Sequence, residues 1–387
     1  MNKISEQKLK CILFGVTKFA HNTVKESVNH SVCEIIAYAD NDSAKHGLVY
    51  ESVEIIAPDE ILHTEFDYIL VGAWYSYSEI YRQLTGLGVE GNKIMPLLTA
   101  KWIKLLVDSI DNIDKDAVIK IFHNGEQLWE QLEEANEINT LYKNMDFADE
   151  DVSPCTDFTK YPLIAHACGG FVNGKKMEYT NSSEAFEEAL SAGFHMFECD
   201  VWGTQEEQII LGSRLMMQCP ISITYQLFSL NRLLDCIAAD LKKKVILDIK
   251  WNTYDDFYRI LRDVEKLADM FERQGFARIR EQIIIETFEE STTRHAAERG
   301  WECILTDYRN PEGRWIKKTA VLCCKYNVKT VLLDAQMALE NLKYIRFLTD
   351  KGIHIICYTV DEIEDYARLK QAGVISILTN YLKPSAK

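Results

Sequence analysis

Acidic side chains and one histidine stand at the ends of short apolar runs between residues 164 and 201. His166 ends the first run, and Glu198 and Asp200 lie two residues apart in the second. Positions i and i+2 of a β-strand point to the same side, so both carboxylates are expected to face one pocket. Two like charges in one pocket need a cation or a shared proton. With a histidine from a neighbouring strand end, the pattern predicts metal-assisted phosphate-ester chemistry with a general base.

A second pair of charged residues follows the same spacing. Asp248 and Lys250 are again two residues apart on an apolar run. Asp248 is a candidate third oxygen ligand, and Lys250 is a candidate point charge for a phosphate oxygen. The alternative is structural, because buried carboxylates need partners and the acids would form an ion-pair network with Lys250 or Arg214. Four residues just past predicted strands are further candidates to line the mouth of the pocket: Arg214, Glu286, Asp307 and Asp334. Of these, Arg214 and Glu286 are candidate substrate-binding residues.

These residues resemble the opening signature of the glycerophosphodiester phosphodiesterases, in the bacterial branch that opens with HA-GG rather than HRG. Two later landmarks also agree with that branch. Residues 247–250 resemble its metal-side carboxylate and lysine, and residues 358–361 and 373–380 resemble its closing TVN and GV-GI-TD segments. The resemblance covers roughly residues 160 to 384. It is carried by His166, Gly169, Gly170, residues 179–185 (YTNSSEA), Glu198-x-Asp200, residues 247–250 (LDIK), 358–361 (YTVD) and 373–380 (GVISILTN).

The resemblance implies a TIM-type barrel of the phosphatidylinositol-phospholipase-C-like kind that cleaves a phosphodiester with a divalent metal, Mg²⁺ or Ca²⁺. It implies that Glu198, Asp200 and Asp248 bind the metal. His166 would be the general base, and Lys250 would stabilise charge on the phosphate oxygens. The substrate would be a small phosphorylated molecule with a glycerol-type hydroxyl next to the phosphate.

The sequence departs from this family where a second catalytic acid/base is expected. The family follows its Glu-x-Asp strand with a strand ending in His-Asp, and those positions here are Gly212 and Ser213. The closing aspartate of the family is Asn380. Glycine cannot transfer a proton, so the metal half of the site is kept and half of the acid/base pair is lost. His195 and His354 are no replacement, because both are expected at strand starts, far from a barrel active site.

Several functions therefore remain open. The first is a phosphodiester hydrolase or phosphotransferase with a degenerate acid/base pair, acting on a glycerophosphodiester-like or polysaccharide-linked phosphate. The second is a catalytically silent protein that binds a phosphate or sugar nucleotide in cell-surface polysaccharide biosynthesis. A third makes the N-terminal domain the active partner and the barrel a platform. Turnover of glycerophosphodiesters with Mg²⁺ or Ca²⁺ would separate the first from the other two.

Strand and helix patterns alternate along the C-terminal part, which predicts a (β/α)₈ barrel over residues 161–387. The link at residues 202–207 is too short for a crossover helix, so we expect a local irregularity there. The predicted barrel strands span residues 162–166, 196–201, 208–212, 244–249, 282–286, 302–305, 329–333 and 353–358.

Residues 1–97 are predicted to form a Rossmann-like, doubly wound α/β domain, followed by a helical linker at residues 98–160. Gly15 ends the first strand and Asp40 the second, which suggests a cofactor site where the acid meets a ribose hydroxyl of a nucleotide. The glycine does not belong to a G-x-G-x-x-G loop, so a structural or oligomerising role is the alternative. The domain also resembles the N-terminal domain of bacterial sugar O-acyltransferases, through residues 14–15, 39–42, 57–61 and 87–89.

The composition excludes some partners. The chain of 387 residues has a net charge of −16, which argues against a nucleic acid or an anionic membrane surface held by charge. Its eleven cysteines show no metal-ligand spacing, and several lie in apolar runs as small hydrophobes. No apolar run is long enough for a transmembrane segment or a secretory leader, so we expect a cytoplasmic protein. A homo-oligomer remains open.

Overall fold

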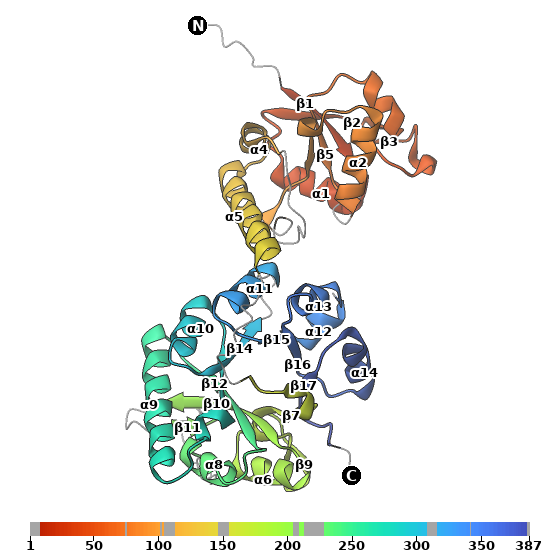
Figure 1. The fold of residues 1–387 in the computed structure, drawn as a ribbon. Helices are drawn as coiled ribbons and strands as arrows, with labels where there is room; N and C mark the ends of the chain where they lie inside the picture. Colours follow the sequence, from red (N-terminus) through yellow and green to blue (C-terminus); the bar gives the residue numbers. More distant parts are fainter. Residues whose placement is uncertain are drawn as a thin grey trace. The chain divides into compact units, whose positions relative to one another are not determined.

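The computed structural model describes residues 8–73, 76–100, 103, 113–145, 155–203, 209–212, 228–307, 316–340 and 342–384. The chain divides into two compact units, Met1–Lys143 and Asn144–Lys387 (Figure 1). The described helices include none that is both long enough and apolar enough to cross a membrane.

The first unit is built on a six-stranded sheet. Its strands run in the order β3-β4-β2-β1-β5-β6, and the five from β4 to β6 are parallel. The edge strand β3 is antiparallel to β4, so the sheet is mixed. Helix α2 (Tyr77–Leu87) packs against it, and α1 (Lys18–Ser27) buries Ala20 and Val24. The strands are β1 (Leu9–Phe14), β2 (Cys33–Ala39), β3 (Val49–Tyr50), β4 (Val53–Ile56), β5 (Tyr68–Val71) and β6 (Ile94–Pro96).

Two helices, α4 (Lys115–Ile121) and α5 (Gly125–Asn144), lie in the region predicted as a linker. Asp114 caps α4 by accepting hydrogen bonds from two backbone N–H groups of its first turn. The end of α4 is tied to the first unit, because the Asn29 N–H donates to the Ile121 carbonyl over 2.7 Å. The predicted helical pattern at residues 104–112 lies outside the described residues.

The second unit is a closed barrel of eight parallel strands. The sheet runs β10-β12-β13-β14-β15-β16-β17-β7, and β7 also pairs with β10, which closes the ring. The central residues of each strand are buried, because these apolar runs are covered on both faces. The barrel strands are β7 (Leu163–Ala165), β10 (Met196–Gly203), β12 (Lys244–Ile249), β13 (Ile283–Thr287), β14 (Glu302–Asp307), β15 (Thr330–Asp334), β16 (His354–Tyr358) and β17 (Ser376–Thr379).

One predicted barrel strand was wrong. The run at residues 208–212 forms β11 (Ile209–Leu211), which pairs antiparallel with β10 and stands outside the ring. The eighth barrel strand is instead β17, in the segment that carries the closing motif of the family resemblance. The irregularity expected at residues 202–207 is thereby explained, because an antiparallel partner follows a short connection and needs no crossover helix.

Helices surround the ring of strands (Figure 1). The longest, α9, shows why they form: Thr253 and Asp256 make a capping box at its start, and its apolar residues face the barrel. The helices that cover the barrel are α6 (Ser183–Ser191), α8 (Leu230–Ile237), α9 (Tyr254–Arg273), α10 (Glu290–Ala297), α11 (Ile316–Lys325), α12 (Ala335–Glu340), α13 (Leu342–Thr349) and α14 (Ile363–Ala372).

The barrel interior begins with an apolar layer to which every strand contributes one residue. Phe158 packs against this layer and is fully buried. Such a layer makes the barrel a packed core rather than a pore. Its members, in chain order, are Ile164, Met196, Ile246, Ile284, Ile304, Leu332, Ile356 and Leu378.

Candidate active site in the mouth of the barrel

The site is the next layer along the same strands. Because side chains alternate with a period of two, the position two residues beyond each apolar layer residue is expected on the inner side, at the carboxyl ends of the strands. Active sites of such barrels lie at this end. The eight residues at these positions are all polar: His166, Glu198, Asp248, Glu286, Thr306, Asp334, Tyr358 and Asn380.

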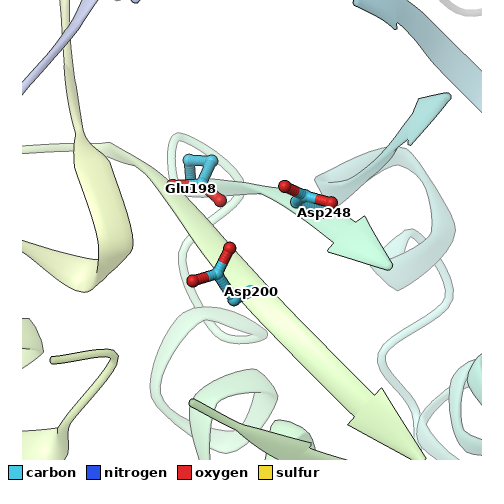
Figure 2. Close-up of side chains that lie close together, drawn as sticks. All are labelled: Glu198, Asp200 and Asp248. Atoms are coloured by element: carbon cyan, nitrogen blue, oxygen red, sulfur yellow. The ribbon is translucent and has the colours of Figure 1, made fainter. Parts of the chain in front are cut away.

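Three carboxylates converge in this region. Each of Glu198, Asp200 and Asp248 offers one oxygen, and these oxygens lie within 4.8 Å of one another. Figure 2 shows all three side chains pointing toward one another from the neighbouring strands β10 and β12. The parallel register that sets Asp200 beside Asp248 produces this arrangement. The sequence-predicted metal residues are therefore brought together.

The backbone and one amide hold two of these carboxylates in place. Oε2 of Glu198 accepts a hydrogen bond from the Ala167 N–H over 2.8 Å. Asp200 forms a reciprocal pair with Asn181, whose Nδ2 donates to Oδ2 of Asp200 and whose Oδ1 accepts from the Asp200 N–H, each over 2.9 Å. Asn181 is buried, and it precedes Ser182, the N-cap of α6. The carboxylates are thus oriented before any ligand arrives.

Lys250 is the cation that the chain itself supplies to this cluster. Its Nζ lies 2.7 Å from Oδ1 of Asp200 and also donates to Oδ2 of Asp248. Burial alone would lower the pKa of Lys250, but Asp248 and Asp200 raise it above its usual value. The ion-pair network considered from the sequence is therefore present in the structure, and Lys250 is charged within it.

The lysine does not satisfy the whole cluster. Oδ1 of Asp248 is buried and has no hydrogen-bond partner among the described residues. Burial and the neighbouring carboxylates raise the pKa of Glu198 well above its usual value. A divalent cation such as Mg²⁺ or Ca²⁺ binds oxygen ligands, so it would coordinate Oδ1 of Asp248 and stabilise the ionised form of Glu198. The donor set therefore fits such a cation.

A fourth acid, Glu286, belongs to the same layer. It is 4% exposed and lies beside Asp248 in the strand register. Its Oε1 accepts a hydrogen bond from Thr306 over 2.7 Å. Burial, and next the charge of Asp248, raise the pKa of Glu286 to about 8. Its predicted partner in substrate binding, Arg214, lies outside the described residues.

These shifts predict how the stability of the metal-free protein depends on pH. Burial raises the pKa of Asp248 from 3.8 to about 6 and that of Glu286 from 4.5 to about 8. Both carboxyl groups hold their proton more tightly in the folded protein than in the unfolded chain. Their contribution to the free energy of unfolding is therefore fully present below the ordinary pKa values, 3.8 and 4.5, and is lost as the pH rises through the folded-state values, about 6 and about 8. We expect a loss on the order of a few kcal/mol, measurable by urea unfolding in chelator. The Glu286→Gln variant should flatten the upper part of this curve, and a stability that rises from pH 5 to 8 would contradict the expectation.

His166 stands directly after β7, at the edge of the carboxylate cluster. Its Nδ1 lies 3.0 Å from Oδ1 of Asn380, and its Nε2 lies 3.8 Å from Oε2 of Glu198. The ring of Tyr179 meets the imidazole edge to face, with centroids 5.0 Å apart. Burial lowers the pKa of His166 below its ordinary value, although the hydrogen bond to Asn380 and the charges of Asp200 and Asp361 act to raise it. A neutral imidazole with Nε2 toward the acids is suited to accept a proton.

Gly170 shows why this histidine is followed by glycines. A Cβ at Gly170 would lie 2.2 Å from the backbone oxygen of Asn380, so only glycine permits the close approach of the two segments. The second glycine of the HACGG segment therefore positions the residue that contacts His166.

Gly212, the position where a second acid/base was expected, lies next to the carboxylate strand. Its N–H donates to the Asp200 carbonyl over 3.2 Å, and its carbonyl accepts from the Trp202 ring N–H over 2.6 Å. A Cβ at Gly212 would have no described atom within 4 Å. The backbone is thus close to the site while the position supplies no proton donor. Ser213 lies outside the described residues.

The candidate cofactor residues of the first unit are used within the chain. Oδ2 of Asp40 accepts from the Val16 N–H and from Lys45, each over 2.8 Å, and Oδ1 accepts from the Asp42 N–H over 2.9 Å. Gly15 has φ of 89°, and a Cβ there would lie 3.0 Å from the Cβ of Ala73. The carboxylate that the sequence assigned to a ribose is bonded to its own loop.

Sequence reasoning missed three residues that shape the site: Asn181, Tyr179 and Asp361. All three lie in segments that carry the family resemblance, residues 179–185 and 358–361, but no role followed from their types. Asp361 lies in the segment after β16, and it contacts His166 only through Asn380. The available signal was the presence of polar residues at strand ends, which does not show which of them bond to one another.

Comparison with known proteins gives different results for the two units. A family model described as C2185-like, N-terminal, matches residues 7–95. Among curated proteins none matches the chain. Similar solved structures include a glycerophosphodiester phosphodiesterase from Parabacteroides distasonis, at 13% identity and a TM-score of 0.45, which covers 57% of this chain and 92% of that chain.

Two further solved structures are similar over the same share of the chain. The glycerophosphodiester phosphodiesterase from Thermotoga maritima is 16% identical with a TM-score of 0.42, covering 57% of this chain and 94% of that chain. A phosphodiesterase from Oleispira antarctica, solved with the product sn-glycerol-3-phosphate, is 10% identical with a TM-score of 0.44, covering 57% of this chain and 92% of that chain.

Proposed function

We propose that the barrel is a metal-dependent phosphodiester hydrolase or phosphotransferase, acting on a glycerophosphodiester-like or polysaccharide-linked phosphate. The observation that carries the proposal is the carboxylate cluster at the barrel mouth, with ligand oxygens within 4.8 Å of one another and one buried oxygen that has no hydrogen-bond partner in the described part of the chain. A neutral histidine stands at its edge. The resemblance of Glu198, Asp200, Asp248, Lys250 and His166 to the signature of the glycerophosphodiester phosphodiesterases supports the proposal, since His166 and Lys250 lie next to these carboxylates.

Each residue has a role that follows from its contacts. Glu198, Asp200 and Asp248 would hold Mg²⁺ or Ca²⁺, which supplies charge stabilisation to a bound phosphate group. Lys250 donates to both aspartates and can turn one of its N–H groups to a phosphate oxygen. His166 accepts the proton of a substrate hydroxyl or of water at Nε2. The glycerol-type hydroxyl next to the phosphate is the nucleophile that this arrangement suits best.

Departure of the leaving group lacks a donor of its own among the described residues we assign to the site, because Gly212 has no side chain. General acid catalysis is worth about 10²- to 10⁴-fold, so a poor leaving group would depart slowly. A good leaving group, such as a nucleoside phosphate, or a substrate that supplies the proton itself would avoid this limit. The proposal therefore includes a preference for substrates of this kind.

Restoring the missing residue gives a prediction. Gly212→His combined with Ser213→Asp should raise kcat/KM on a simple glycerophosphodiester, because the Gly212 backbone already bonds to Asp200. The control is Gly212→Ala, which adds a Cβ into space free of described atoms and no proton donor. The proposal that the site lacks one of its two acid/base groups would be contradicted if the wild type had the same kcat/KM on this substrate as an enzyme with both groups. Another residue would then donate the proton to the leaving group.

The lack of a side-chain acid at Gly212 favours a second function. The protein would be catalytically silent and would bind a phosphate or sugar nucleotide in cell-surface polysaccharide biosynthesis. In this case the cluster would bind metal and phosphate without turnover. The first unit would then be the place for a nucleotide, in a Rossmann-like domain, or for assembly into a homo-oligomer. Its Asp40 would have to release Val16 and Lys45 to meet a ribose.

Phosphorus NMR of a glycerophosphodiester incubated with the full chain separates the two functions. With Mg²⁺ or Ca²⁺ in excess, the hydrolase or phosphotransferase predicts a new phosphomonoester or cyclic phosphodiester signal that is absent in chelator. The silent binder predicts a metal-dependent broadening of the substrate signal and no new one.

A further inference from the structure

A chain of hydrogen bonds leads from His166 away from the carboxylate cluster. Nδ1 of His166 lies 3.0 Å from Oδ1 of Asn380, and Nδ2 of Asn380 donates to Oδ2 of Asp361 over 2.9 Å. We propose that Asp361 is a positioning residue for His166: it fixes the amide of Asn380, and that amide fixes the imidazole tautomer that leaves Nε2 unprotonated. The inference rests on the proposed role of His166 as the base.

The orientation of the Asn380 amide follows from what surrounds Asp361. Oδ1 of Asp361 accepts hydrogen bonds from the Thr379 hydroxyl over 2.9 Å, from the Asn380 N–H over 2.7 Å and from the Tyr381 N–H over 3.2 Å. The carboxyl of Asp361 therefore serves as an acceptor only. The amide group facing its Oδ2 has to be the NH₂ of Asn380, because an amide oxygen there would meet another acceptor.

The fixed amide then decides the tautomer. With Nδ2 of Asn380 used by Asp361, the atom facing His166 is the amide oxygen, which only accepts. Nδ1 of His166 must donate to it, so the single proton of a neutral imidazole is on Nδ1. Nε2 keeps its lone pair on the side of Glu198, 3.8 Å away. The hydrogen bond that one ring nitrogen makes sets what the other can do.

The segments that carry these residues are held close together. Asn380 directly follows β17 and is 5% exposed, and its backbone oxygen approaches Gly170 so closely that no side chain would fit there. The side chain of His166 is 13% exposed. Little freedom is left for the amide or the ring to rearrange without a change in their partners.

Exchanging acid and amide along this chain gives a test with opposite outcomes. In Asp361→Asn the new amide oxygen would take the place of Oδ1 and accept the same three hydrogen bonds, from the Thr379 hydroxyl and the two backbone N–H groups. The new NH₂ group would then face Asn380. Asn380 would then turn its oxygen toward residue 361 and its NH₂ toward His166, so the imidazole proton would move to Nε2. Adding Asn380→Asp restores an acceptor next to Nδ1 and should return the proton there.

The measurement is nitrogen NMR of the full chain with ¹⁵N-labelled histidine at slightly alkaline pH, with and without Mg²⁺. A His166→Gln variant identifies the resonances of His166. Protonated and bare ring nitrogens resonate far apart, so the tautomer is read directly. Wild type should show the proton on Nδ1, Asp361→Asn on Nε2, and the double variant on Nδ1 again. The control is Asp350→Asn, which neutralises an exposed acid after α13.

Turnover provides a second reading. Loss of the Nε2 lone pair should lower kcat of Asp361→Asn by about 10²- to 10⁴-fold with KM little changed, and the double variant should recover part of it. If Asp361→Asn does not fold, Asn380→Ala serves instead, since removing the amide should leave His166 as a mixture of tautomers.

Failure of this inference and failure of the proposed function look different. A folded Asp361→Asn protein, or a folded Asn380→Ala protein, with the proton still wholly on Nδ1 would overturn the positioning role even if the enzyme is active. So would a double variant that keeps the proton on Nε2. An inactive wild type with the expected tautomer exchange would leave the positioning role standing and remove the proposed function.

Discussion

The double variant Glu198→Gln with Asp200→Asn is expected to lose all binding of Mg²⁺ and Ca²⁺ that calorimetry detects in the wild type. Two of the three converging carboxylates would become neutral amides, and Asp248 alone would be left with Lys250. Neutral amides of similar size preserve the packing, so the variant should remain folded. The metal ion needs the negative charge of its oxygen ligands, and one carboxylate paired with a lysine offers too little of it.

The matched control for this variant removes the same charge elsewhere. Glu362→Gln with Asp350→Asn neutralises two exposed acids of the barrel unit and should leave metal binding unchanged. Because both double variants change the net charge by the same amount, general electrostatic attraction cancels in the comparison. Equal heats of binding in wild type and in the Glu198→Gln, Asp200→Asn protein would show that the cation binds somewhere else.

His166→Ala is expected to lower kcat on the preferred phosphodiester by about 10²- to 10⁴-fold, the usual contribution of a general base. The protein should stay folded, because among the described residues the imidazole makes one hydrogen bond, to Asn380, and its loss costs about 1 kcal/mol. KM should change little, since the metal-binding carboxylates and Lys250 remain. Steady-state kinetics and a thermal unfolding curve measure the two expectations separately.

His354→Ala is the control, because His354 is exposed at the start of β16, the end of the barrel away from the site. It should leave kcat and KM at wild-type values. If turnover of His166→Ala stays within about tenfold of the wild type, the base is another group, because the loss of a true base costs more than that.

Much of the site could be predicted from the sequence because strand periodicity is a local property. Glu198 with Asp200, and Asp248 with Lys250, share an i, i+2 spacing on apolar runs, and this spacing sets the two side chains of each pair on one face. The parallel register of β10 and β12 then places Asp200 beside Asp248. The convergence of the carboxylates follows from these two facts.

The direction of strand pairing could not be predicted in the same way. Residues 208–212 and the segment of β17 are both short apolar runs, and periodicity does not tell whether such a run joins a parallel ring or folds back on its neighbour. The short link before residue 208 was the evidence for a hairpin. An interpretation of this link as an irregularity within the barrel gives residues 208–212 the place that belongs to β17, the eighth strand of the ring.

Side-chain partners are the second feature that the sequence does not specify. Asp40 and Asp361 both follow strands, and by type and position they are equivalent candidates for a ligand. In the structure Asp40 accepts bonds from its own loop, while Asp361 fixes the amide that faces His166. The difference depends on loop conformations and on contacts between residues far apart in the chain, which a spacing pattern does not contain.

The most direct test of a single cation between the three carboxylates is anomalous diffraction from crystals of the full chain grown with Mn²⁺ and glycerol phosphate. Mn²⁺ takes the same oxygen ligands as Mg²⁺ and Ca²⁺. We expect one strong anomalous peak within ligand distance of Glu198, Asp200 and the orphaned oxygen of Asp248, with the phosphate beside it and within reach of Lys250. A phosphate bound to Lys250 with no peak at the carboxylates, or a peak at another site alone, would contradict the proposed metal-dependent chemistry.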